Sequence, residues 1–148
     1  MESQAWKSLL MDWSRKEFQE PMLKNKNIVL PADFLEEKGK MLDIGPYTAK
    51  KFSEMIQSSK MVLWNGPLGR FEIKRFAKGT TSIWRAILKN RKARVVIGGG
   101  ETVASSKLMT NDLKLITSKR KNVFVSTGGG AMLDYLAGKK LPGIEALK

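Results

Sequence analysis

The chain has 148 residues, with 27 Lys and Arg against 14 Asp and Glu and neither His nor Cys, so its formal net charge is +13 and its sequence pI is about 10.1. The absence of Cys and His excludes disulfide frameworks, zinc fingers, thiol nucleophiles and triads that need a histidine base. The length suits one domain, and its apolar runs are far shorter than the ~20 residues that span a bilayer. Because no secretory signal is visible either, we expect a soluble, cytoplasmic protein without membrane contact.

The positive charge is concentrated in the second half of the chain. Residues 1–60 carry 10 basic and 9 acidic side chains, whereas residues 61–148 carry 17 and 5, a net charge of +12. This half favours anions, and phosphorylated small molecules, nucleic acids and a solvated basic surface all remain compatible with it. No aromatic residue interleaves the basic clusters at 89–94 and 119–121, so neither is typical of a platform on which bases stack.

The first predicted element is an amphipathic helix over residues 5–18. Trp6, Leu9, Leu10 and Trp13 recur there at helical spacing, and Pro21 limits how far the helix extends. We therefore expect residues 1–26 to form a helical N-terminal segment.

Two further helices and four strands follow in alternation. Pro46 opens a helical pattern over 46–58, and a second pattern covers 73–89. The strands are predicted from continuous apolar runs at 27–31, 61–66, 94–98 and 122–126. Continuous rather than alternating apolar runs are typical of parallel strands buried on both faces. The sequence thus predicts an α/β fold in which a mostly parallel sheet of about four strands is flanked by helices, with Trp6, Trp13 and Trp84 in the core.

Two glycine-rich turns share one plan. Gly98–Gly100 and Gly128–Gly130 each follow a predicted strand and precede a short helix. Such turns expose backbone N–H groups that can cradle phosphate at the carboxyl edge of a sheet, although tight packing also explains one glycine triplet. Their occurrence in consecutive units favours anion binding. The P-loop and dinucleotide-binding motifs are both absent from the sequence.

Six motifs together resemble one enzyme family. They are Asp43-Ile44-Gly45-Pro46, Leu63-Trp64-Asn65-Gly66-Pro67-Leu68-Gly69-Arg70-Phe71-Glu72, Phe76-Ala77-Lys78-Gly79-Thr80, Gly98-Gly99-Gly100-Glu101-Thr102, Ser126-Thr127-Gly128-Gly129-Gly130-Ala131 and Leu141-Pro142-Gly143-Ile144-Glu145-Ala146-Leu147. In this order they closely resemble the C-terminal nucleotide-binding domain of phosphoglycerate kinase. Residues 27–34 look like the preceding strand of that domain, and residues 1–26 match only loosely. The resemblance implies that residues 1–148 are a single partial domain of doubly wound, Rossmann-like type.

The resemblance implies roles for the residues of these motifs. Asn65, Pro67 and Glu72 would line the adenosine side of a nucleotide pocket, with Glu72 accepting hydrogen bonds from the ribose hydroxyls. The segment Gly99-Gly100-Glu101-Thr102 would meet the phosphates and the metal.

The implied ligand is ADP or ATP with Mg²⁺, for which Glu101 would be the protein ligand, because Mg²⁺ takes hard oxygen ligands. Gly128 would belong to the nucleotide site. Gly129 and Gly130 would act catalytically together with Thr102, since their backbone N–H groups would point at the phosphoryl group in transfer.

The sequence also departs from the family pattern. Glu101 stands where the family has Asp, and Arg70 stands where the family has an apolar residue. No segment resembles the family's N-terminal domain, which holds the phosphoglycerate with basic residues including a catalytic Arg, or the glycine- and lysine-bearing loops that contact the nucleotide phosphates.

Two functional hypotheses follow. The first is a C-terminal fragment of phosphoglycerate kinase, which transfers a phosphoryl group between 1,3-bisphosphoglycerate with ADP and 3-phosphoglycerate with ATP. This fragment would carry part of the nucleotide site, would be inactive alone, and would have the missing segments as a candidate partner chain. The alternative is a non-catalytic basic module that binds RNA or another polyanion. A third, structural possibility is a truncated gene product with no role of its own.

Overall fold

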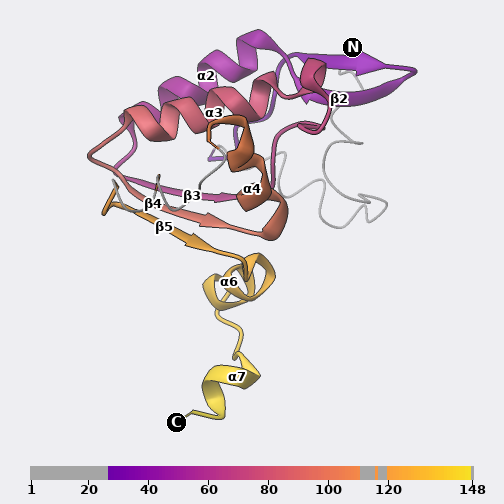
Figure 1. Ribbon diagram of the computed structural model, residues 1–148. Coiled ribbons are helices and arrows are strands. Elements are labelled where there is room, and N and C mark those ends of the chain that lie inside the picture. The colour runs from indigo at the N-terminus through magenta and orange to yellow at the C-terminus, as the bar shows by residue number, and fades with distance from the viewer. Residues whose placement is uncertain (1–26, 111–115, 117–119, 148) are drawn as a thin grey trace.

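A computed structural model describes residues 27–110, 116 and 120–147. The described chain alternates strands and helices, and its C-terminal end projects away from the rest of the described structure (Figure 1). Its elements are β1 (Phe34–Glu37), β2 (Lys40–Ile44), α2 (Pro46–Ser58), β3 (Met61–Asn65), the 3₁₀ helix η2 (Lys74–Phe76), α3 (Lys78–Lys89), β4 (Arg94–Gly98), α4 (Gly100–Ala104), the 3₁₀ helix η3 (Ser105–Leu108), β5 (Val123–Ser126), α6 (Gly129–Leu136) and α7 (Pro142–Glu145).

The central sheet is parallel, which confirms the predicted α/β class. Its strand order is β3-β4-β5, and its register pairs Met61 with Arg94 and Gly98 with Ser126. Helices α2 and α3 pack side by side over one face of this sheet (Figure 1). Because all three strands run in the same direction, the segments that follow them meet at one edge.

The strand predicted at residues 27–31 is wrong, so the described parallel sheet has three strands rather than about four. The chain beyond this segment is instead held at the start of α2. Backbone N–H groups of Ala32 and Asp33 donate to the hydroxyl of Thr48 at 2.9 and 3.1 Å, and Gly45 N donates to Asp33 O at 2.7 Å. These tertiary bonds override the strand propensity of the apolar run.

An antiparallel hairpin of β1 and β2 follows this segment, and no sequence pattern predicts it. Its two-residue turn has positive φ at both Lys38 (51°) and Gly39 (72°), which matches the twist of antiparallel strands. The turn cannot be recognised from the sequence, because Lys38 occupies a position of positive φ that residues other than Gly, Asn and Asp seldom adopt.

The helix predicted over 46–58 is confirmed as α2, whereas the one predicted over 73–89 is divided. A 3₁₀ turn, η2, comes first, and α3 starts only at Lys78. The helix predicted over 5–18 and the whole segment 1–26 lie outside the described residues.

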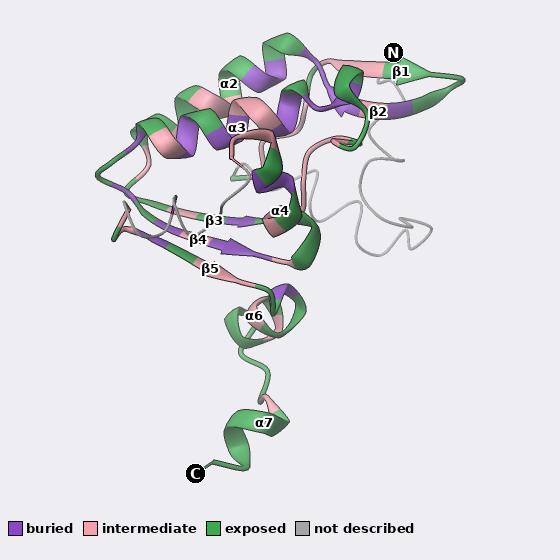
Figure 2. Cartoon of the chain, in the orientation of Figure 1, coloured by how far each residue is buried: buried purple, intermediate pink, exposed green. Residues whose placement is uncertain are grey.

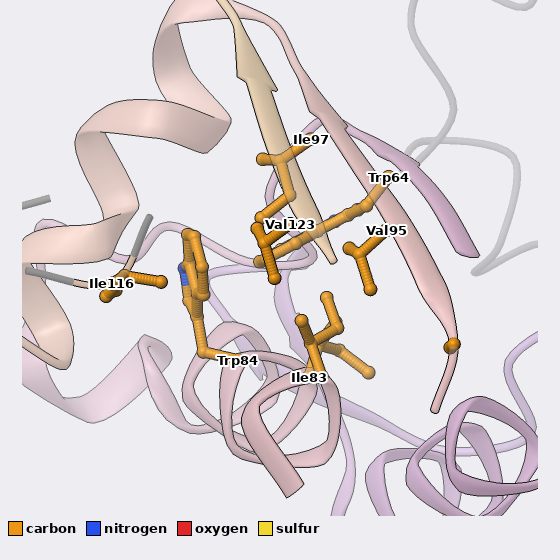
Figure 3. Packing of buried hydrophobic residues seen from close by; sticks show 9 residues of the cluster. Trp64, Ile83, Trp84, Val95, Ile97, Ile116 and Val123 are labelled. Carbon is orange, nitrogen blue, oxygen red and sulfur yellow. The ribbon is translucent and has the colours of Figure 1, made fainter. Parts of the chain in front are cut away.

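The core lies between α3 and the sheet (Figure 3). Trp84 is fully buried, and its indole N–H donates to the Ser105 hydroxyl at 2.8 Å. Its ring meets Trp64 edge to face with centroids 5.0 Å apart, a favoured aromatic geometry. Trp84 is therefore a core residue, as predicted. Trp6 and Trp13 fall outside the described residues.

Asp33 caps α2 from outside the helix. Its carboxylate accepts hydrogen bonds from Tyr47 N at 2.9 Å and Thr48 N at 2.7 Å, which are otherwise unsatisfied N–H groups of the first turn. Burial works against the charge, but the hydrogen bonds from the Thr48 hydroxyl and from these two N–H groups outweigh it and hold the pKa of Asp33 below its ordinary value of 3.8.

We expect Asp33→Ala to lower the free energy of unfolding at pH 7 by about 1–2 kcal/mol, the usual cost of losing a helix cap. A lowered pKa means that this stabilisation is complete above pH 3.8 and is lost as pH falls through the folded-state pKa. Urea denaturation at pH 7 and pH 3 measures both effects. The control is Glu54→Ala on the exposed side of α2, and an equal loss in both variants would contradict the capping role.

Candidate functional site

The two glycine turns come into contact beyond the carboxyl ends of the parallel strands. A β-carbon placed on Gly129 would lie 2.7 Å from the Cα of Gly99, and one placed on Gly99 would lie 2.5 Å from Oδ1 of Asn65. Gly99 N also donates to Ser126 O at 3.1 Å, which ties the ends of β4 and β5 together. The structure thus brings Asn65, Gly99 and Gly129 to one place, as the strand order implies.

Packing explains only some of these glycines. Gly99 has φ of +89°, and Gly129 is buried against it, so both positions need glycine for structural reasons. In contrast, β-carbons on Gly100 and Gly130 would meet nothing within 4 Å, and one on Gly128 would make only an ordinary contact. Gly100, Gly128 and Gly130 are exposed, which leaves space for a ligand above the turns.

Thr102 lies beneath the glycine turns rather than at their surface. It is fully buried, and its hydroxyl accepts a hydrogen bond from Gly66 N at 2.6 Å. Trp64 reinforces the same turn by donating its indole N–H to Gly66 O at 2.7 Å. In this structure the Thr102 side chain therefore braces the turn after β3 against α4.

A cleft of about 510 Å³ opens beside these turns. Its lining residues are Pro67, Gly69, Arg70, Phe71, Glu72, Ile73 and Glu101. The volume falls within the range of small-molecule sites. The cleft brings together Pro67, Glu72 and Glu101 of the predicted set, whereas Asn65, Thr102 and the glycines of the two turns lie outside its lining.

Asp43 is a structurally important residue whose role the sequence motifs do not reveal. Its carboxylate is fully buried and accepts hydrogen bonds from Ile44 N and Gly79 N, each at 2.9 Å. A β-carbon on Gly69 or Gly79 would overlap it. Burial raises the pKa of Asp43, while backbone hydrogen bonds from Gly79, Ile44 and Lys78 oppose that shift.

Asp43 thereby positions one wall of the cleft. It holds the Gly69 segment against the start of α3, and Arg70 N donates to Leu42 O at 2.8 Å beside it. Its place in the motif Asp43–Pro46 is the signal that the sequence offers. The carboxylate of Asp43 accepts a hydrogen bond from Gly79 N, at the start of a helix 36 residues further along the chain. Nothing in a single sequence indicates such a bond.

The described ranges contain no cluster of three or more His, Cys, Asp or Glu side chains that could hold a metal ion by themselves. Glu72 and Glu101 are both exposed at the cleft. Any cation there would need most of its ligands from water or from another bound molecule.

Comparison with known proteins identifies the family. The family model for phosphoglycerate kinase matches residues 9–139. The chain belongs to the phosphoglycerate kinase family. It is 42% identical over 120 residues to the phosphoglycerate kinase of Maridesulfovibrio salexigens and 47% identical over 106 residues to that of Koribacter versatilis. These matches cover 81% and 72% of this chain but only 28% and 25% of the two relatives.

Solved phosphoglycerate kinases share the fold. The structure from Coxiella burnetii matches with a TM-score of 0.59 at 35% identity, over 74% of this chain and 26% of that one. The structure from Pyrococcus horikoshii matches with a TM-score of 0.60 at 37% identity, over 73% and 24%. The present chain therefore spans about a quarter of the length of the phosphoglycerate kinases it resembles. No helix in the described part is long and apolar enough to cross a membrane.

Proposed function

We propose that this chain is a C-terminal portion of a phosphoglycerate kinase that binds the adenosine part of a magnesium–nucleotide complex, ADP or ATP. The family reaction is reversible phosphoryl transfer between 1,3-bisphosphoglycerate with ADP and 3-phosphoglycerate with ATP. The observation that carries the proposal is the cleft of about 510 Å³, because it joins Pro67, Glu72 and Glu101 from two separate family motifs.

Glu72 is the proposed ribose ligand. Its exposed carboxylate lines the cleft and can accept hydrogen bonds from two hydroxyls, which is the chemistry of ribose recognition. Pro67 would contact the apolar face of the nucleoside. Asn65 would act indirectly, because its Oδ1 lies against Gly99 and Gly129 and so positions both turns.

The phosphates would lie over the exposed glycines. Gly100, Gly128 and Gly130 leave open space in which phosphate oxygens could approach the backbone N–H groups. Thr102 and Gly129 are buried below this space and are proposed to position the turns, which refines the catalytic role implied for them by the family resemblance.

The residues present fit magnesium held jointly with a nucleotide. Mg²⁺ usually keeps several waters and takes one or two carboxylates plus substrate phosphates. Glu101 is an exposed carboxylate on the wall of the cleft, directly after the glycine turn that ends at Gly100, so it would be that protein ligand. When bound, the ion would neutralise negative charge on the phosphates.

We expect weak, saturable binding of MgADP and MgATP by isothermal titration calorimetry. Glu72→Ala should weaken it by at least about 10-fold, since a hydrogen bond to a charged group contributes roughly 1.5–3 kcal/mol. Glu54→Ala, which removes an exposed carboxylate from α2, is the control and should leave the affinity unchanged. Saturable binding that Glu72→Ala does not affect would place the nucleotide elsewhere.

The remaining kinase segments are the proposed partner, supplied by a separate polypeptide or by a longer form of this chain. The proposal includes a cytoplasmic location, where glycolysis supplies both substrates. The relatives and solved structures reported above are phosphoglycerate kinases, and none of them favours the alternative of an RNA-binding module.

A further inference from the structure

One face of the parallel sheet is largely uncovered in the described structure. Side chains alternate along a strand, so Leu63, Val96 and Phe124, which are paired in register, form one row on the face opposite α2 and α3. Phe124 is 64% exposed and Leu63 is 40% exposed, and Met61 beside them is 62% exposed. Figure 2 shows that buried, intermediate and exposed residues occur within these strands.

Helix α6 covers only the carboxyl end of this face. A β-carbon on Gly98 would overlap Met132 of α6, so the contact lies at the last residue of β4. Parallel sheets are normally covered on both faces, and an exposed row of this kind is typical of a docking surface. We call Met61, Leu63, Val96 and Phe124 the bare face.

The segment before residue 27 has the pattern and length to cover the bare face. Its apolar residues Trp6, Leu9, Leu10 and Trp13 would form one stripe of a helix. A helix over 5–18 would be about 21 Å long and about 10 Å wide. A five-residue strand is about 17 Å long, and three strands span about 10 Å, so one such helix matches the face.

Charge also favours this occupant. Residues 1–20 carry four acidic and three basic side chains, whereas residues 61–148 carry a net charge of +12. Arg94 is exposed and paired in register with Met61, at the amino end of the bare face. Glu17 follows Trp13 by four residues, so on a helix its carboxylate would lie on the same face as the apolar stripe. A second copy of this chain would instead bring +13 against +13.

The connecting segment is long enough. Ile28 lies ten positions after Phe18, and an extended chain of ten residues reaches about 33 Å. That exceeds the radius of gyration of a chain of this size, about 15 Å.

We propose that residues 5–18 form an amphipathic helix that docks its Trp6–Leu9–Leu10–Trp13 stripe onto the bare face of β3, β4 and β5. The sheet then has helices on both faces, and the N-terminal segment is part of the folded domain. This inference does not depend on nucleotide binding.

The test uses the absence of cysteine from the chain, which makes every introduced thiol unique. The full-length double variant Leu10→Cys/Phe124→Cys is treated with a short bismaleimide, and the products are resolved by denaturing electrophoresis and mass spectrometry. Its matched control is Leu10→Cys/Tyr47→Cys, because Tyr47 is 63% exposed and lies on α2 beyond the opposite face. We expect cross-linked monomer several-fold above control in the first pair.

A second pair of variants distinguishes a docked helix from random collisions between the N-terminal segment and the sheet. In the Leu10→Cys/Phe124→Cys background, Trp13→Glu should remove most of the intramolecular product, since it places a charge in the apolar contact. Ser8→Glu, on the polar side of the same helix, should leave the product unchanged. Equal cross-linking of both cysteine pairs, equal effects of the two Glu substitutions, or products that join two chains would each overturn the proposal. The last outcome would instead indicate self-association through the bare face.

Discussion

Purified chain, mixed with Mg²⁺, ATP and 3-phosphoglycerate in a coupled assay, is expected to give no phosphoglycerate kinase turnover above background. Phosphoryl transfer is catalysed mainly by positioning both substrates and by neutralising charge around the moving group. The cleft beside the glycine turns supplies groups for one substrate at most, because Arg70 is the one basic side chain among its described lining residues.

The expected deficit is large. Arginines that stabilise transferring phosphoryl groups contribute roughly 10³- to 10⁵-fold in rate. By family resemblance, the catalytic Arg and the lysine-bearing loops belong to segments that have no counterpart in this sequence. Under the proposed function, Glu101 in place of the family's Asp would also move the carboxylate relative to a magnesium ion, which tolerates little geometric error.

The assay discriminates between three outcomes. Background turnover agrees with the proposed partial site. Turnover of the chain alone that disappears with Thr102→Ala or Glu101→Ala would show a self-sufficient enzyme and contradict the account of what is missing. Turnover that appears only when the absent segments are added as a second polypeptide would identify one piece of a split kinase.

The elements that could be predicted are those whose signal is local. Helix α2 has its predicted bounds because Pro46 opens it and its apolar stripe is regular. The strands β3, β4 and β5 could be predicted from continuous apolar runs, and their parallel pairing followed from the helices between them. The contact of two glycine turns followed in turn from that topology.

The elements that could not be predicted depend on tertiary contacts. The apolar run at 27–31 lost its predicted strand because the next residues bond to Thr48 and Gly45 at the start of α2. The motif resemblance implied that Thr102 and Gly129 lie at the phosphates, but it carried no information about how far each residue is buried. Only the structure shows that both lie below the exposed glycines. The wall of the cleft likewise depends on Asp43, whose partners are far away in the sequence.

Asp43→Ala should be strongly destabilising, with an expected loss of about 3–5 kcal/mol in the free energy of unfolding. The substitution leaves the N–H groups of Ile44 and Gly79 buried without acceptors, and each such group costs roughly 1–3 kcal/mol, to which the cavity adds. The loss is a large share of the roughly 5–15 kcal/mol typical of a domain. Urea denaturation followed by circular dichroism measures it.

Asp43→Asn separates the role of the acceptor oxygen from that of the charge. Burial raises the pKa of Asp43, so ionisation itself does not favour the folded state, and Asn should lose only about 1 kcal/mol because it retains one acceptor. A raised folded-state pKa means that the wild-type protein loses stability as pH rises from 3.8 through that pKa. The difference in the free energy of unfolding between wild type and Asp43→Asn should therefore become smaller as the pH rises over this window. A difference that widens instead would show that the charge, rather than the oxygen acceptors, holds α3 against β2.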